Sequence, residues 1–205
     1  GTGILALSTF GPITAGAGYF NNTNLNNSFE LNAQQRLGLT NQITGGNGAT
    51  GVLDGGSDMY VATVQGDLDF VKLEAWYAGL QETFNTYTLA ATSSIDLAQD
   101  AKIGVEARYV NLKLDQEAAN SINTAVGGTG IDAETKNDMF RLAVDGKFSI
   151  VNARLAYTKT GKKGGLTALD QDAKNTSLGW AITSNGAADA DYFQAALGAD
   201  ILDNL

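Results

Sequence analysis

The sequence predicts an all-β chain, an antiparallel up-and-down transmembrane β-barrel with short periplasmic turns and long extracellular loops. Apolar and polar residues alternate with a period of two in several segments, as expected for strands with one face in lipid. No segment approaches the roughly 18 consecutive apolar residues that a membrane helix requires. The predicted strands are joined by short and long connections in alternation, which is typical of such barrels.

The period-two alternation is clearest in residues 13–20, 70–77, 102–109 and 151–158. A helical arrangement would mix the charged and apolar side chains of these segments on one surface, whereas a strand separates them. We therefore predict four strands, and their apolar faces comprise Ile13, Ala15, Ala17 and Tyr19; Val71, Leu73, Ala75 and Tyr77; Ile103, Val105, Ala107 and Tyr109; and Val151, Ala153, Leu155 and Tyr157.

Partner strands are predicted beside these four, which gives about nine or ten strands in total. They comprise residues 3–10, 59–65, 83–93, 139–144, 192–201 and, more weakly, 178–182. Short turns follow residues 10, 65 and 144, whereas long polar segments cover roughly 21–57, 115–137 and 160–190. We interpret residues 1–205 as one barrel domain, a fragment that lacks N-terminal and C-terminal strands of the complete barrel.

Aromatic residues close the apolar faces of the four clearest strands. Tyr19, Tyr77, Tyr109 and Tyr157 each have the parity of the apolar face and lie at the same end of their strands. This placement predicts an aromatic girdle at one membrane interface. Candidates for the opposite girdle flank the short turns and are Phe10, Phe70 and Phe148.

The composition excludes several classes of function. The sequence contains no His and no Cys, so a Ser-His-Asp triad, a disulfide or a thiolate metal site is impossible. We expect no enzyme activity. The net charge is −9, which argues against nucleic acid as a partner because that function requires a basic surface.

The faces opposite the apolar ones carry charges of both signs. A dry core would have to desolvate these charges, which is costly for each unpaired ion, whereas a water-filled lumen would not. The alternative is a soluble sheet with one hydrated face. The candidate pore-lining residues are Lys72, Glu74, Glu106, Arg108, Arg141 and Arg154.

The three arginines of this set form a basic ladder that we expect to face acidic residues of the loops, as in pores whose charged walls select ions. The first long segment, 21–57, is a candidate constriction loop because of its length. Asp189 and Asp191 are candidate Ca²⁺ ligands, since carboxylate oxygens are the ligands that Ca²⁺ prefers. No cofactor is otherwise required. The basic turn 161–165 is a candidate contact with anionic lipopolysaccharide, although an ordinary solvated loop explains it better.

Several segments resemble the central part of the major outer membrane porins of the Campylobacter type. They are GTGILALSTFGPITAGAGYF, DMYVATVQGDLDFVKLEAWYAGL, KIGVEARYVNLKL, NDMFRLAVDGKFSIVNARLAYTKTG and residues 176–201. The resemblance implies a barrel of about 16 to 18 strands, a homotrimer, a weakly cation-selective pore, and a divalent cation near the constriction, for which Asp189 and Asp191 are the residues carried over. The N-terminal strands and the terminal aromatic residue of the family are missing here.

Taken together, the sequence predicts a protein of the cell outer membrane, in contact with its lipid and lipopolysaccharide. We expect a porin that lets ions and small polar solutes diffuse through passively. The alternative is a structural or adhesive surface protein that acts through its long extracellular loops. A barrel enzyme is a third alternative, which the absence of His disfavours.

Overall fold

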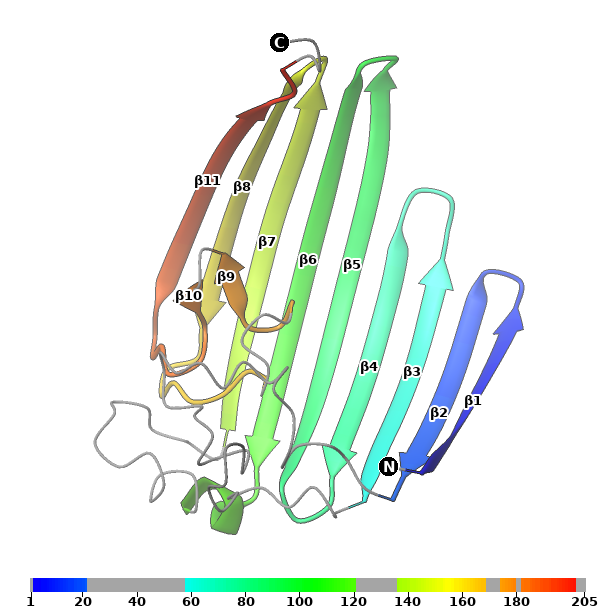
Figure 1. Ribbon diagram of the computed structural model, residues 1–205, viewed down its shortest axis with the longest axis vertical. Helices are drawn as coiled ribbons and strands as arrows, with labels where there is room; N and C mark the ends of the chain where they lie inside the picture. Colours follow the sequence, from blue (N-terminus) through cyan, green and yellow to red (C-terminus); the bar gives the residue numbers. More distant parts are fainter. Residues whose placement is uncertain (1, 22–57, 121–135, 169–173, 180–181, 202–205) are drawn as a thin grey trace.

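The computed structural model describes residues 2–21, 58–120, 136–168, 174–179 and 182–201, and its main feature is a nine-stranded antiparallel sheet (Figure 1). Neighbouring strands follow one another along the chain, except that β11 pairs directly with β8. The strands of this sheet are β1 (Gly3–Phe10), β2 (Ile13–Phe20), β3 (Met59–Asp67), β4 (Lys72–Leu80), β5 (Phe84–Ala98), β6 (Ala101–Leu114), β7 (Lys136–Phe148), β8 (Val151–Thr160) and β11 (Asp191–Ala199).

The sheet confirms the predicted all-β, up-and-down architecture. Short turns join β1 to β2, β3 to β4, β5 to β6 and β7 to β8 at the upper end of Figure 1. The long connections after β2, β6 and β8 leave from the opposite end. The sheet is open, because β1 and β11 are its edge strands among the described residues.

Three predictions about individual strands need correction. The predicted strands 83–93 and 139–144 are too short, because β5 pairs with β6 as far as Ala98 and β7 spans Lys136–Phe148, so the turn predicted after residue 144 follows Phe148 instead. The predicted strand 178–182 is not part of the large sheet, since its residues belong to a separate pair, β9 (Ser177–Gly179) and β10 (Ile182–Thr183). Gly179 has a φ of +90°, a conformation that interrupts an extended strand and that glycine adopts readily.

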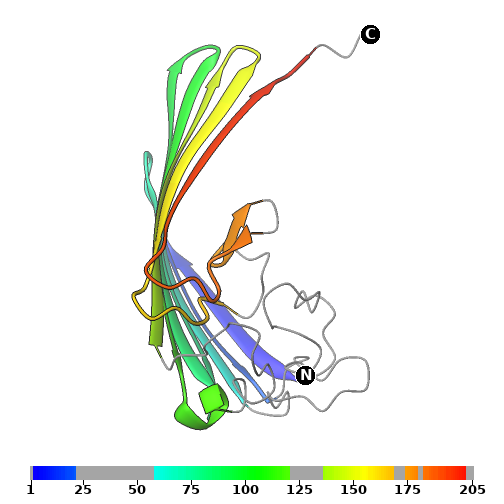
Figure 2. The same cartoon turned by 90° about the vertical axis from the view of Figure 1, so that its left-hand side faces the viewer.

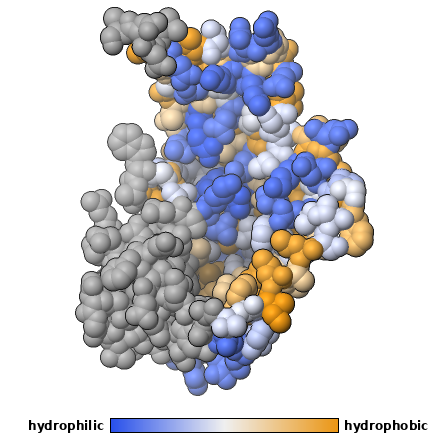
Figure 3. Space-filling view, turned by 45° about the vertical axis from the view of Figure 1, so that its right-hand side comes forward, coloured by the Kyte–Doolittle hydropathy of each residue, from blue (hydrophilic) through white to orange (hydrophobic). Residues whose placement is uncertain are grey.

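The sheet is strongly curved, and the β9–β10 pair lies on its hollow side (Figure 2). We call this side the concave face and the opposite side the convex face. Because side chains alternate between the two sides of a strand, the register of the ladders assigns each side chain to one face. Figure 3 looks obliquely at the molecule and shows hydrophilic residues running along much of its length, with hydrophobic residues at the margins.

Apolar side chains cover the convex face and are exposed. Leu73 is 47% exposed, Leu155 65% and Leu197 80%, so no second layer of the described chain packs against them. An apolar surface that extends across neighbouring strands marks a contact with another molecule or with lipid. In the nine described strands, no charged side chain lies on this face between the tyrosines and the short turns.

The convex face also carries a row of aromatic residues near the end of the long connections. Cross-strand partners in this row are Tyr19 with Tyr60, Tyr77 with Tyr87, Tyr109 with Phe140, and Tyr157 with Phe193. Ring centroids in three of these pairs are 5.4, 5.1 and 5.1 Å apart. Each of the eight consecutive strands from β2 to β11 thus contributes one ring.

The row contains all four predicted tyrosines and adds four aromatic residues that the sequence analysis missed. At the other end of the convex face, Phe10 and Phe148 flank short turns and are exposed. Phe140 and Phe148 are eight residues apart on β7, about 26 Å along the strand at about 3.3 Å per residue. Such a band matches the roughly 25 Å apolar band of outer-membrane barrels. Among the described residues, no helix reaches the length and apolar character needed to cross a membrane.

Candidate functional site

The structure places all six candidate pore-lining residues on the concave face. One line of cross-strand partners runs from Glu74 through Ala90 and Arg108 to Arg141 and Thr158. A second line of partners, closer to the short turns, contains Lys72 and Glu106. A third line, closer still, contains Arg154 and its partner Asp145. The period-two pattern thus assigned these residues to one common surface, although their side chains differ in exposure.

Arg108 and Arg141 lie directly opposite each other and are almost completely buried, at 7% and 6% exposure. Two buried guanidinium groups side by side require acceptors for their N–H groups. For Arg108, the Nε atom lies 3.2 Å from Glu106 Oε1, and Nη1 donates to Asn175 Oδ1 at 3.1 Å. Asn175 Nδ2 in turn donates to Thr88 Oγ1 at 2.9 Å.

Arg141 binds the chain that crosses the concave face. Its Nη1 donates to the carbonyl oxygen of Lys174 at 2.7 Å, and its Nη2 donates to that of Ser177 at 2.6 Å. Its Nε also donates to Thr158 Oγ1 on β8 at 3.2 Å. Charge-assisted hydrogen bonds of this kind are about twice as strong as neutral ones, so Arg141 is the principal attachment of this chain to the sheet.

Arg154 has a different environment, since it is partly exposed and bonded within the sheet. Its Nη1 donates to both carboxylate oxygens of Asp145, at 3.0 and 2.8 Å, and its Nε donates to Gln194 Oε1 at 3.3 Å. Among the described residues, the arginine ladder therefore faces strand carboxylates and uncharged loop atoms. The described loop residues that bind the ladder contribute the Asn175 amide and two backbone carbonyls, and the expectation that it faces acidic loop residues stays a prediction for the acidic residues outside the described ranges.

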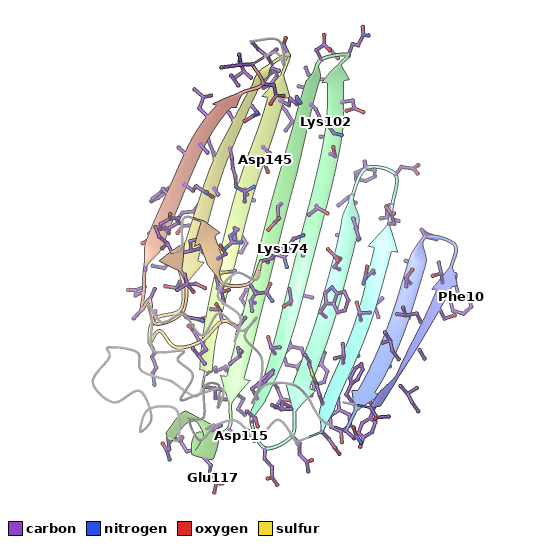
Figure 4. All side chains as sticks on the ribbon, viewed as in Figure 1. Phe10, Lys102, Asp115, Glu117, Asp145 and Lys174 are labelled. Atoms are coloured by element: carbon purple, nitrogen blue, oxygen red, sulfur yellow. The ribbon has the colours of Figure 1, made fainter. Side chains whose placement is uncertain are left out.

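The chain held by Arg141 belongs to the third long connection. We call its described residues, 161–168, 174–179 and 182–190, the inward segment (Figure 4, with Lys174 labelled). Buried polar groups hold it together: the Thr167 backbone N–H donates to Asn185 Oδ1 at 2.7 Å, and Asn185 Nδ2 donates to the Ala168 carbonyl at 2.9 Å. Segment 21–57, predicted as the constriction loop, lies outside the described residues apart from position 21.

Apolar residues line the concave face between the two arginines, which bind the inward segment, and the end of the long connections. Val110, Leu112 and Leu114 on β6 and Met139 on β7 are 0 to 2% exposed, and Leu166 of the inward segment is also buried. We call this region the covered half. The sequence analysis missed it, although a signal exists: after Tyr109 the apolar residues of β6 change from odd to even positions.

The concave face beyond the arginines, towards the short turns, is polar and uncovered. We call it the open half. Its hollow is lined by Lys102, Asp145, Lys147, Asn152 and Arg154, among others. Lys102 and Asp145 project from the upper parts of β6 and β7 in Figure 4. Charges of both signs in an open hollow can interact with passing ions and with water.

The two candidate metal ligands lie at the opposite end of the molecule, near the start of β11. Lys159 Nζ lies 2.9 Å from Asp189 Oδ1 and 3.3 Å from Asp191 Oδ2, so one ammonium group already binds both carboxylates and offsets one of their two charges. The Tyr157 hydroxyl donates to Asp191 Oδ1 at 2.5 Å. Among the described residues, no group of three or more carboxylate, His or Cys side chains could hold a metal ion. The Ca²⁺ site stays a prediction.

No protein-family model and no curated protein matches the sequence. Solved structures do match. The chain is similar to the outer membrane protein OprD from Pseudomonas aeruginosa, with 14% identity, a TM-score of 0.59, and coverage of 94% of this chain and 42% of that one. An improved structure of OprD gives 16% identity, a TM-score of 0.57, and coverage of 96% and 44%. The outer membrane protein OpdK from the same organism is 14% identical, with a TM-score of 0.54, and the match covers 80% of this chain and 39% of that one.

These similarities show the fold. The chain has the fold of an outer-membrane β-barrel, and it spans less than half of the length of the structures it matches. They show the barrel fold alone and carry no argument for the Campylobacter-type family in particular.

Proposed function

We propose that the protein is a porin of the cell outer membrane and that this chain forms part of the wall of its water-filled channel. The observation that carries this proposal is the opposite chemistry of the two faces of one sheet. The convex face has exposed apolar residues bounded by aromatic ones, as a wall in contact with lipid requires. The concave face carries Lys72, Glu74, Lys102 and Arg154, which water must solvate.

The inward segment would narrow this channel. It lies on the concave face and is attached through Arg108 and Arg141, so it would reduce the space available to solutes along the covered half. Its position also favours the channel over the adhesive alternative, because a connection that turns inward presents less surface to an external partner. The proposed activity is passive diffusion of ions and small polar solutes, without catalysis.

We further propose that the channel is weakly cation-selective. Arg108 and Arg141 are buried against the inward segment, and Arg154 is paired with Asp145, so the three arginines add little free positive charge to the lumen. The chain as a whole carries a net charge of −9, which attracts cations to the entrances of the channel. The homotrimer implied by the resemblance stays a prediction.

Planar lipid bilayers test the proposal. The intact protein should produce stepwise increases in conductance with no partner present, and a KCl gradient should give a reversal potential of the sign expected for a K⁺ preference. A protein that inserts without conducting would contradict the porin proposal and favour the adhesive alternative. Conductance with a Cl⁻ preference would overturn only the cation selectivity.

A further inference from the structure

One tryptophan is exposed on the concave face, on β4 near the boundary between the covered and open halves. Trp76 is 39% exposed, and the register gives it the same face as Glu74, two residues earlier on the strand. The other aromatic side chains that the register places on this face of the described strands are Phe20, Phe84 and Tyr192, and all of them are buried or partly buried. Trp76 is therefore the aromatic ring that this part of the wall presents to the proposed channel.

The cross-strand neighbours of Trp76 are shorter than the indole and leave it raised above the sheet. These partners are Thr63 and Thr88, which are 6% and 5% exposed, and the next concave residue along β4 is Ala78. Side chains on one face lie only about 5 Å apart across neighbouring strands, so a large ring between two threonines covers part of them and keeps its own outer surface in solvent. The Trp76 Nε1 atom donates to Glu74 Oε1 at 3.4 Å, which limits rotation of the ring.

Hydrogen-bonding groups border the ring on the side of the open half. Gln65 lies directly opposite Glu74 on β3, and its Nε2 donates to Thr63 Oγ1 at 3.2 Å, which leaves the amide oxygen available as an acceptor. Glu74 adds its carboxylate oxygens, and Lys72 adds an ammonium group on a half-exposed side chain. The exposed ring thus has both donors and acceptors at its edge.

The charges beside Trp76 are balanced. Lys72 Nζ lies 3.9 Å from Glu74 Oε1, and Arg108 Nε lies 3.2 Å from Glu106 Oε1, so each of these carboxylates has a cationic partner. An organic cation is attracted to the face of a tryptophan, but here it would also approach the Lys72 ammonium group. The surroundings of the ring therefore favour an uncharged ligand.

The inward segment approaches the sheet beside this ring. Asn175 Nδ2 donates to Thr88 Oγ1 at 2.9 Å, and Thr88 is a cross-strand partner of Trp76. Arg108, which binds the same Asn175, lies on one line of partners with Glu74. A solute that passes the inward segment along this wall therefore comes within reach of the ring and of its polar neighbours.

These features together define one class of ligand. A pyranose ring has C–H groups on its faces, which pack on an indole through dispersion and weak C–H contacts. Its edge carries hydroxyl groups, each of which both donates and accepts hydrogen bonds. A planar aromatic solute would use the indole but leave Gln65, Glu74 and Lys72 without a role, and an inorganic ion would leave the indole without one.

We propose that Trp76, Glu74, Gln65 and Lys72 form a binding site for the pyranose ring of an uncharged sugar. The sugar stacks on the indole, Glu74 and Gln65 accept hydrogen bonds from its hydroxyl groups, and Lys72 donates one. The inference rests on the proposed channel function and deepens it, because it names a class of solute that the wall binds during passage.

Block of the ion current by maltotriose tests the proposal. With the intact protein in a planar bilayer, maltotriose should reduce the conductance in a saturable way. W76L should raise the half-blocking concentration about tenfold, because contact with an aromatic ring contributes up to roughly that factor, and W76F, which keeps a ring, should stay within about threefold of the wild type. Absence of block, or equal block of W76L and the wild type, would overturn the proposal.

Two further variants separate the site from general effects of substitution. Y87L removes an exposed ring from the convex face of the neighbouring strand β5, so maltotriose should block it as it blocks the wild type. Q65L removes the amide and should raise the half-blocking concentration several-fold. Equal losses in W76L and Y87L, or unchanged block of Q65L, would contradict a sugar site of this composition.

A binding measurement without ion flow identifies the class of ligand. In a detergent that has no sugar headgroup, saturation-transfer NMR should show contact between the intact protein and the C–H protons of maltotriose, and W76L should lose most of this signal. Tetramethylammonium at the same concentration should not compete. Competition by this cation would reassign the ring to organic cations and overturn the sugar site.

The two measurements also distinguish this inference from the proposed function. A protein that conducts, but that maltotriose neither binds nor blocks, overturns this inference alone. A protein that binds maltotriose in detergent without conducting in bilayers overturns the porin proposal and leaves the sugar site standing.

Discussion

The two halves of the concave face lie on the same strands and have the same side-chain parity, yet their chemistry is opposite. In the covered half, Leu112 and Met139 are buried. In the open half, Lys102 and Asp145 surround a polar hollow. The comparison shows that alternation along a strand identifies which side chains share a face, whereas the chain lying over that face decides whether it is dry or hydrated.

The boundary between the halves is formed by Arg108 and Arg141. Both guanidinium groups have their acceptors in the sheet and in the inward segment. Charged side chains at this point satisfy carbonyl oxygens that would otherwise be buried without donors. The arginines thus make the covered half possible.

The largest effect is expected for R141M, which removes the attachment of the inward segment. R141M leaves the carbonyl oxygens of Lys174 and Ser177 without this donor, and each buried polar group left unsatisfied costs about 1 to 3 kcal/mol. We expect a loss of this size in urea unfolding, together with higher single-channel conductance. R154M removes an exposed pair and should lower stability by less than about 1 kcal/mol. Equal effects of the two variants would contradict the assigned role of Arg141.

A smaller effect is expected for L112N, which puts an amide of similar size into the covered half. Buried polar atoms without partners lower stability by about 1 to 3 kcal/mol, and we expect a loss of about 2 to 3 kcal/mol in the same unfolding measurement. T92N, on the concave face of neighbouring β5, should stay within about 0.5 kcal/mol of the wild type. A neutral L112N would show that water already reaches the covered half.

Thiol labelling sharpens the same comparison without a change of charge. The sequence has no Cys, so single cysteines can be introduced without background. In the folded protein, S94C should react with a charged, membrane-impermeant thiol reagent at least about 100-fold faster than L112C, because each 1.4 kcal/mol needed to open a buried site slows reaction about tenfold. Similar rates would mean that the inward segment does not cover Leu112 in solution.

The smallest effect on stability is expected for D145N in the open half. Exposed ion pairs contribute at most about 1 kcal/mol, so unfolding should hardly change. The reversal potential should nevertheless shift towards anions, since a negative charge leaves the wall while Arg154 remains. D191N removes the same charge from the start of β11, beyond the aromatic row, and should leave the reversal potential unchanged. A shift in D191N alone would place the conducting path elsewhere.

Most of the sheet could be predicted because it depends on short-range patterns. The alternation at 102–109 identifies the β6 strand and its faces, and a short turn was correctly expected between β7 and β8, although it follows Phe148 and not residue 144. Tyr19 and Tyr157 likewise predict the aromatic row, because their position and parity are visible in the sequence.

The covered half could not be predicted in the same way. Arg141 binds carbonyl oxygens of residues 33 and 36 positions away, and backbone carbonyls leave no trace in the sequence. The sequence alone therefore predicts Arg141 as a pore-lining residue like Arg108 and Arg154, and gives no sign of its bonds to the inward segment. The even-numbered apolar residues Val110 and Leu112 were the available signal, but their meaning depends on knowing that the third long connection turns inward.

The inward segment begins and ends at the same place, and this has a consequence for engineering. The Thr160 backbone N–H donates to the Ala190 carbonyl at 3.0 Å, and the Asp189 N–H donates to the Gly161 carbonyl at 2.8 Å. The pairing of β8 with β11 extends up to these two hydrogen bonds. The residues between the two strands could therefore be replaced while the strand pair stays intact. A tight turn could replace them without disturbing the strand register, although Leu112 and Met139 would then need polar replacements to keep the wall stable.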